Sequence, residues 1–205
     1  MDLITSPSEI EKKSFEIITE QLTGRYFEPE NINVIKRVVH TTADFDYVDN
    51  LVFSDGVVKY AKKLINSGAH IVTDTQMARS GINKAVAAQK GCDVHCFIDA
   101  PEIIATAQAG GYTRARAAVD HAVKLLKNPI IFVVGNAPTA LIRLYELINT
   151  NVFSPALVIG VPVGFVNVIE SKEMILMLDI PHIIAKGQKG GSNVAAAICN
   201  ALLYE

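Results

Sequence analysis

Short, continuous apolar runs alternate with helical stretches over the last two thirds of the chain. The runs are AHIVTD, DVHCFID, IIFVVG, ALVIGVPV and PHIIAKG, at residues 69–74, 93–99, 130–135, 156–163 and 181–187. Continuous runs indicate strands buried on both faces, as in a parallel sheet between helix layers. Helices are expected at about 102–109, 113–127, 137–149, 170–178 and 192–203, and the crossover at 75–92 is the least regular piece.

The first third of the chain shows helical periodicity instead. Ser6 precedes Pro7, and Glu9 follows three residues after Ser6, which predicts a capped helix start. A second helix is expected from about Pro29 to His40, and a third from about 54 to 68. These helices would lie outside the sheet.

Together the elements predict one domain over residues 1–205. The expected fold is a three-layer α/β/α flavodoxin-like sandwich, with a five-stranded, mainly parallel sheet and an N-terminal helical extension. A length of 205 residues, half of them apolar, suits one core, and a net charge of −2 gives no reason to expect nucleic acid. Three cysteines without a secretory signal, and no apolar run near the roughly 18 residues of a membrane span, predict a cytoplasmic protein that does not enter the membrane.

The loops that follow the strands are candidates for a binding site. Ligands of such sheets bind beyond the carboxyl ends of the strands. The exit loops read DTQMARSG, DAPE, GNAPTA, GVPVGFV and GQKGGS. Glycine there either lets backbone N–H groups approach a ligand or simply turns the chain, and several such loops on one edge favour a large site. GQKGGS follows Lys186, contains Lys189 and precedes a helix, and it fits an anion site and an ordinary turn equally well.

Familiar catalytic and metal motifs are missing from the sequence. No G-x-G-x-x-G follows the first strand, which argues against a dinucleotide site, and there is no G-x-S-x-G. In CDVHC, Cys92 and Cys96 are expected on one face of a strand and His95 on the other, which favours buried thiols over a metal site. The remaining histidines of this part are expected to stand alone in structural positions: His70, His121 and His182.

Seven segments match one protein family in order. They are SFEII, RVVHTTADFDY, DTQMARSGI, GGYTRARAAVD, GNAPTAL, VIGVPVGFVNVIESKE and GQKGGSNVAAAICNAL, at 14–18, 37–47, 74–82, 110–120, 135–141, 158–173 and 187–202. Through them, essentially the whole chain resembles the precorrin-8X methylmutases, also called cobalt-precorrin-8 methylmutases, of cobalamin (vitamin B12) biosynthesis. Asn167 is a departure, since a small residue is more usual there.

The resemblance implies an isomerase with a flavodoxin-like fold. Such an enzyme moves a methyl group from C-11 to C-12 of precorrin-8X or cobalt-precorrin-8, a suprafacial 1,5-sigmatropic shift that gives hydrogenobyrinate or cobyrinate. It needs neither a redox cofactor nor a protein-bound metal. The implied partners are the corrinoid substrate and product, a second subunit in a homodimer with the active site near the interface, and, transiently, other enzymes of the pathway. The HTTADFDY run is closer to the cobalt-early branch.

The resemblance also gives His40 a chemical role. His40 aligns with the family's active-site histidine, and is expected to donate to a ring nitrogen near the migrating methyl group. A helix C-terminus favours the imidazolium, whereas burial under an apolar macrocycle favours the neutral ring, so the protonation state is open. Arg114 and Ser14 match family positions at or near the substrate; the alternatives are a solvated arginine and a surface serine.

The carboxylates of the substrate define the other binding candidates. Acetate and propionate groups ring the macrocycle, and glycine loops, helix N-termini and basic side chains can bind them. The predicted substrate-binding residues are Ser14, Thr41, Asp74, Arg114, Arg116, Asn136, Lys189 and Gly190. Thr42 and Asp44 are expected to position His40 or the substrate.

Two other functions fit the generic features. A corrinoid carrier would need the anion-binding loops but not His40. A flavodoxin-like flavin or nucleotide binder would use the same edge of the sheet.

Overall fold

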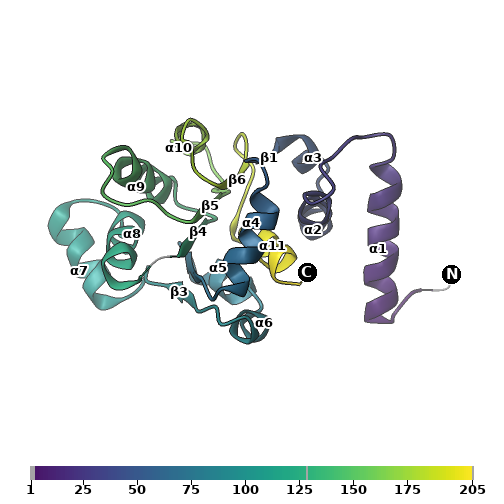
Figure 1. Ribbon diagram of the computed structural model, residues 1–205, viewed down its shortest axis with the longest axis horizontal. Helices are drawn as coiled ribbons and strands as arrows, with labels where there is room; N and C mark the ends of the chain where they lie inside the picture. Colours follow the sequence, from purple (N-terminus) through teal and green to yellow (C-terminus); the bar gives the residue numbers. More distant parts are fainter. Residues whose placement is uncertain (1–2, 128, 205) are drawn as a thin grey trace.

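The computed structural model describes residues 3–127 and 129–204, and Figure 1 shows a central sheet with helices on both faces. The strands are β1 (Leu51–Phe53), β2 (His70–Thr73), β3 (Val94–Cys96), β4 (Ile130–Val134), β5 (Leu157–Gly160) and β6 (His182–Ala185). The helices are α1 (Pro7–Gln21), α2 (Ile32–Thr42), α3 (Tyr47–Asn50), α4 (Val57–Asn66), α5 (Gln76–Gly81), α6 (Lys84–Gln89), α7 (Pro101–Gly110), α8 (Arg114–Leu125), α9 (Pro138–Asn149), α10 (Val168–Leu176) and α11 (Ser192–Leu203).

The strand order confirms the flavodoxin-like prediction. The order across the sheet is β1-β6-β5-β4-β2-β3, and every pair except β1 with β6 is parallel. Without β1, the five parallel strands follow the flavodoxin order 2-1-3-4-5. The order reverses between β2 and β4, so the topological switch point lies between these two strands.

The five-stranded prediction is wrong by one strand. β1 pairs antiparallel with β6, and Leu51 lies opposite Ala185. Three residues between two turns show no periodicity that separates a strand from a loop, so pairing with β6 alone defines β1. The five predicted strands are present, each shorter than expected.

Residues of β4 explain why the predicted strands read as continuous apolar runs. Ile131 and Val133 pack in one core with α2, α4 and α11, whereas Phe132 and Val134 pack in another with α8, α9 and α10. Both faces of the strand are therefore buried, which confirms the three-layer architecture. α11 packs against α2, and α2 in turn carries α1 on its outer side (Figure 1).

The helix starts differ from the predictions in detail. The Ser6 hydroxyl bonds the Ser8 hydroxyl at 3.1 Å and makes no cap bond, so the predicted capping box is wrong. The irregular crossover forms two short helices, α5 and α6, capped by the side chains of Thr75 and Asn83. Among the helices of the described residues, none combines the length and apolarity of a membrane span.

Candidate active site

His40 lies in the last turn of α2, next to a sharp change of chain direction. Ala43, just after the helix, adopts a left-handed conformation with φ 53°. The Thr42 hydroxyl donates to the Val38 carbonyl at 2.8 Å and accepts the Asp44 N–H at 3.2 Å. These bonds fix the turn that follows His40, and the positioning role of Thr42 stays a prediction.

The ring of Phe15, on α1, holds the imidazole of His40. The two ring centroids are 5.2 Å apart, and the rings stack with 29° between their planes. Arg37, three residues before His40 on α2, lies over the same Phe15 ring at 4.9 Å and donates to Glu11 Oε1 at 2.8 Å. Side chains three residues apart share one face of a helix, so α2 offers both groups to one aromatic ring. Phe15 thereby restricts the orientation of His40.

His40 is half-buried and lines two hollows of the surface. One, of about 240 Å³, lies between α1 and α2 and is also lined by Ser14 and Phe45. The other, of about 380 Å³, lies between α2, α5 and α11 and is also lined by Thr41 and Asn193. The imidazole is therefore accessible from two sides and is not sealed in the core.

Lys189 joins the last loop to the segment after His40. Its Nζ lies 2.5 Å from Asp44 Oδ2 and 2.6 Å from Asp46 Oδ2. The hydrogen bond from Lys189 holds the pKa of Asp44 below its ordinary value, and the hydrogen bonds to both carboxylates raise the pKa of Lys189. The positive charge of Lys189 is thus already balanced, so its direct contact with a substrate stays a prediction.

Asp74 occupies the switch point between β2 and β4. Its Oδ1 accepts the N–H of Gly135 at 2.8 Å, and its Oδ2 accepts those of Asn136 and Ala137 at 2.8 and 2.7 Å. Burial raises the pKa of Asp74, and the three N–H donors oppose that shift. Donors that face a ligand in other sheets of this topology are here bound to a carboxylate of the chain itself. The structure gives Asp74 a loop-holding role, and its predicted substrate contact remains untested.

A buried lysine holds the GQKGGS loop from below. Lys172 of α10 is 1% exposed, and its Nζ donates to the carbonyls of Gly187 and Lys189 at 2.7 and 2.9 Å. Burial lowers the pKa of Lys172 to about 8, whereas hydrogen bonds to two carbonyls favour the charged form. Sequence reasoning missed this residue.

Gly190 lies where any side chain would collide with the backbone. A Cβ atom there would lie 2.1 Å from the Val161 carbonyl oxygen and 2.7 Å from that of Pro162. The adjacent Gly191 N–H donates to the Val161 carbonyl at 2.9 Å. The loops after β5 and β6 therefore pack backbone against backbone, and glycine has a structural reason at this position.

Arg114 and Arg116 differ in their surroundings. Arg114 is exposed at the start of α8 and lines a hollow of about 480 Å³ with Tyr112. Arg116 instead makes a two-point ion pair with Glu146, at 2.9 and 2.8 Å. The Thr113 side chain caps α8 and donates to Thr139, in the first turn of α9 after the β4 exit loop, at 2.7 Å. The structure thus places Arg114 beside the exit loops, while Arg116 has a structural partner.

The predicted site residues fall into separate groups within one subunit. Ser14, Thr41 and His40 gather at α1 and α2, and Lys189 and Gly190 lie beside the turn after α2. Arg114 and Arg116 belong to α8, across the sheet from α2 in Figure 1. Asn136 is exposed after β4, above Asp74.

The structure adds residues that the motifs did not single out. Phe15 and Lys172 stood inside matched segments, but nothing in their spacing revealed their contacts. The loop after β5 exposes three apolar side chains, and Phe165 is 85% exposed. The three side chains are Val163, Phe165 and Val166. In the sequence, the only signal for this exposed apolar surface was a short apolar run inside a glycine-containing loop.

The prediction for the histidines is wrong in one respect. His70 does not stand alone, because its Nδ1 lies 3.2 Å from His95 Nε2. His182 is buried and bonds the Ile180 carbonyl, which agrees with a structural role. The thiol prediction is confirmed for Cys92, which is buried, while Cys96 is half-buried.

Comparison with known proteins identifies the family. The profile of the precorrin-8X methylmutase family matches residues 9–205. The chain belongs to this family. It is 46% identical to the cobalt-precorrin-8 methylmutase of Salmonella typhimurium, over 100% of this chain and 98% of that protein, and 36% identical to the precorrin-8X methylmutase of Pseudomonas aeruginosa, over 100% and 99%. A crystal structure of the precorrin-8X methylmutase from Thermus thermophilus superposes with a TM-score of 0.87, at 38% identity and 95% coverage of both chains.

Membership makes this methylmutase an isomerase of the cobalamin pathway, and it confirms the resemblance seen in the motifs.

The unusual Asn167 has a conformational explanation. Its φ is 58°, in the left-handed region, and asparagine is among the few residues other than glycine that tolerate this region.

Proposed function

We propose that this methylmutase carries out the C-11 to C-12 methyl shift on a corrinoid held against His40. In a sigmatropic shift, the bond from C-11 to the methyl carbon breaks as the bond to C-12 forms, with no leaving group. The protein then has only to hold a distorted conformer of the ring and to polarise its conjugated system. The accessible, oriented imidazole of His40 is the observation that carries the proposal.

His40 would act as a hydrogen-bond or proton donor to a ring nitrogen near the migrating methyl group. An imidazole suits this role because it exchanges protons near neutral pH. Phe15 restricts the ring of His40, and the bonds of Thr42 fix the turn beside it, so the donor needs little reorganisation during the reaction. Ser14 and Thr41, which line the two hollows, are suited to bind the polar rim of the macrocycle.

Apolar and charged surfaces near the loops suit a flat disc edged with carboxylates. Phe165 and Val166 are 85% and 77% exposed and offer an apolar surface for the ring. The exposed Arg114, together with the exposed Asn136 in the loop between β4 and α9, would bind acetate or propionate groups. Gly190 and Lys189 would contribute through the loop that they form, in which Lys189 is tied to Asp44.

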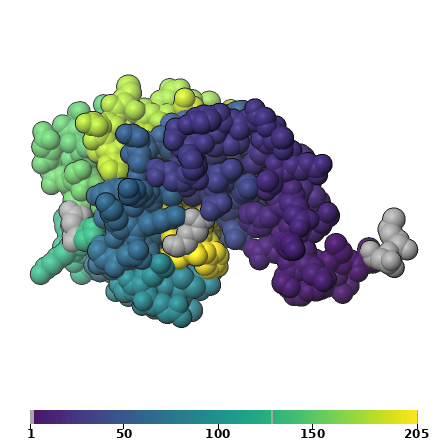
Figure 2. Space-filling view, turned by 45° about the vertical axis from the view of Figure 1, so that its right-hand side comes forward, coloured from purple at the N-terminus to yellow at the C-terminus, as the bar shows by residue number. Residues whose placement is uncertain are grey.

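We infer that the site is completed by a second subunit. α1 and α2 lie at one end of the long axis in Figure 1, and α7 and α8 at the other. His40 on α2 and Arg114 on α8 therefore belong to opposite ends of one subunit, and in a dimer the partner subunit's Arg114 would face His40 instead. α1 protrudes from the body in Figure 2, and Ile10 and Ile17 on it are each 45% exposed. Their apolar surface suits contact with a second copy of the chain.

A spectroscopic assay separates the enzyme from a corrinoid carrier. Purified protein incubated with precorrin-8X or cobalt-precorrin-8 should produce the absorption change of the rearranged chromophore without a change in mass. Binding without that change would support the carrier and refute the proposal. If the purified protein retains a flavin and the absorption change does not occur, a flavodoxin-like flavin binder would be favoured instead.

Mixed dimers test the two-subunit site. His40→Ala and Arg114→Ala proteins, each weakly active at low substrate concentration, would be unfolded together and refolded. If one site uses both subunits, the mixture regains about one quarter of wild-type activity, because half of the dimers are mixed and each mixed dimer holds one intact site. A mixture that shows only the average activity of the two variants contradicts the inference.

Three finer assignments follow the same proposal. Three relatives that are 46%, 41% and 39% identical to this chain are named cobalt-precorrin-8 methylmutases, so we favour the cobalt-containing substrate, testable by comparing kcat/KM for both substrates. The three free cysteines suit the reducing cytoplasm.

Transient contact with the neighbouring pathway enzymes would pass the intermediate on, and kinetic channelling assays would detect it.

A further inference from the structure

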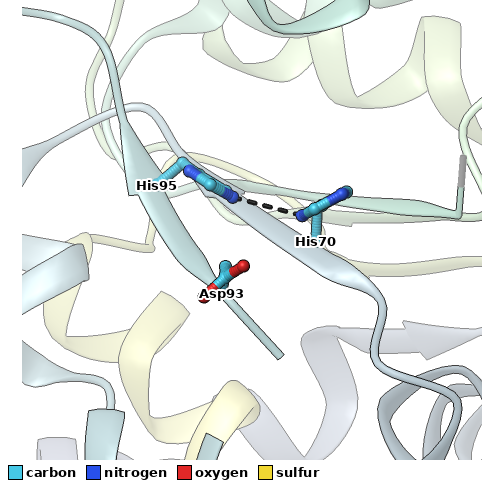
Figure 3. A group of neighbouring side chains, drawn as sticks. All are labelled: His70, Asp93 and His95. Carbon is cyan, nitrogen blue, oxygen red and sulfur yellow. Dashed lines mark hydrogen bonds between the residues drawn. The ribbon is translucent and has the colours of Figure 1, made fainter. Parts of the chain in front are cut away.

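Three potential metal ligands converge at the amino end of the sheet, on the edge formed by β2 and β3. His70 begins β2, Asp93 immediately precedes β3, and His95 is the middle residue of β3. Figure 3 shows the two rings side by side, with the Asp93 carboxylate directed toward them. The candidate ligand atoms all lie within 4.8 Å of one another.

The strand register explains why these side chains meet. β2 and β3 are parallel, and Val72 lies opposite His95. Residues two apart on a strand point to the same face, so His70 shares the face of Val72, and Asp93 shares that of His95. The backbone pairing therefore brings the three side chains to one face of this sheet edge, and their rotamers set the distances between the ligand atoms.

The spacing of the two imidazoles suits a shared metal ion. Zinc binds histidine nitrogen at about 2.0–2.1 Å in tetrahedral geometry, which puts two ligating nitrogens about 3.3 Å apart. His95 Nε2 and His70 Nδ1 lie 3.2 Å apart. The distance between the two nitrogens therefore already suits a shared ion. Coordination would replace the hydrogen bond that now joins the rings, and each ring would turn so that its nitrogen lone pair points to the metal.

Neighbouring side chains fix one ring and leave the carboxylate free to adjust. The His95 ring stacks on Phe97, with the planes 11° apart and the centroids at 5.6 Å. Asp93 is exposed, so a rotamer change can bring its oxygen to bonding distance. Two imidazoles and one carboxylate are ligands that zinc takes, and they leave a fourth tetrahedral position for water.

We propose that His70, Asp93 and His95 form a binding site for a divalent transition metal ion of the zinc class. The ion would fasten the edge strand β3 to β2. The site lies at the opposite end of β2 from Asp74, which follows the last residue of that strand, so it is separate from the exit loops. It takes no part in the methyl shift, and the proposal is independent of the proposed function.

Zinc binding by untagged, chelator-treated protein provides the test, because a histidine tag would itself bind metal. Isothermal titration with Zn²⁺ should give one site per chain, and Co²⁺ in its place should give the visible absorption bands of a tetrahedral site. In His70→Ala and His95→Ala the affinity should fall by more than the roughly 10–100-fold that loss of an outer partner costs a metal site. His121→Ala is the matched control, since His121 contacts Phe97 but lies outside the three ligands.

Asp93→Asn keeps the test informative if a histidine variant is poorly folded, because Asp93 is exposed. This variant should fold as the wild type does and should bind Zn²⁺ more weakly. Zn²⁺ should also raise the melting temperature of wild type and of His121→Ala, but not that of His95→Ala. Absence of stoichiometric binding to wild-type protein, or equal affinity in wild type and both histidine variants, would overturn the proposal.

Discussion

Replacing Lys172 with methionine would remove an ammonium group from the protein interior. In the wild type this group is 1% exposed and supports the carbonyls of Gly187 and Lys189. Methionine has a similar length and no donor, so the two carbonyls lose their partner and the GQKGGS loop is released. We expect turnover to fall severely, because the loop carries Gly190 and the Lys189 contact with Asp44.

The effect of Lys172→Met on stability should be small at neutral pH and should depend on pH. Burial lowers the pKa of Lys172 from 10.5 in the unfolded chain to about 8 in the fold. That difference corresponds to a cost of about 3 kcal/mol for burying the charge. Two carbonyls without a donor cost about 1–3 kcal/mol each, less where water reaches them. Together the two carbonyls cost up to about 2–6 kcal/mol, so the opposed contributions cancel in large part.

The sign of the pH dependence follows from the lowered pKa. Between about pH 8 and 10.5 the unfolded chain binds more protons at Lys172 than the folded chain does, so wild-type stability rises with pH. From pH 7 to 9.5 the rise due to this residue is up to about 2 kcal/mol, and the two carbonyl acceptors reduce it.

Urea unfolding of wild type and Lys172→Met at both pH values measures this rise as a difference, in which other titrating groups cancel. Lys63→Met, on the exposed side of α4, is the control for loss of a surface lysine. An equal change of stability with pH in wild type and Lys172→Met, or full turnover by Lys172→Met, would refute the reasoning.

Four further substitutions probe the loops and the arginines. Asp74→Asn replaces an acceptor of three N–H groups with a partial donor, and should lower the free energy of unfolding by about 1–3 kcal/mol in urea titrations. Gly190→Ala places a Cβ against the Val161 carbonyl, so turnover should drop, with KM raised in steady-state assays. Arg114→Met should weaken corrinoid binding in absorption titrations while stability stays within about 0.5 kcal/mol of wild type. Arg116→Met should instead cost about 1 kcal/mol of stability through Glu146 and leave binding unchanged.

The parallel sheet could be predicted because burial leaves a residue pattern. Ile130 to Val134 are apolar without alternation since helices cover both faces of β4. β1 could not be predicted, because Leu51–Phe53 is too short to show a period and becomes a strand only by pairing with β6. The predicted capping bond at the start of α1 is not formed, because the Ser6 hydroxyl bonds the Ser8 hydroxyl instead.

A family motif preserves side-chain identity, so the sequence could single out His40, whose catalytic role stays a prediction. The site was not predictable where backbone groups are the partners. Lys172 bonds two carbonyls 15 and 17 residues away, and carbonyls leave no mark in a sequence. The pair of His70 and His95 depends on the register between two strands, which an apolar run does not specify.

Single turnover by His40→Gln tests the central claim most directly. Glutamine keeps a donor group of similar reach but cannot transfer a proton near neutral pH. With enzyme in excess over cobalt-precorrin-8, and concentrated enough to bind all of it, stopped-flow absorption separates binding from rearrangement. The account predicts binding close to wild type and a rearrangement rate lower by about 100-fold or more, the range expected for loss of a general acid. A rearrangement rate near that of wild type at full occupancy would contradict it.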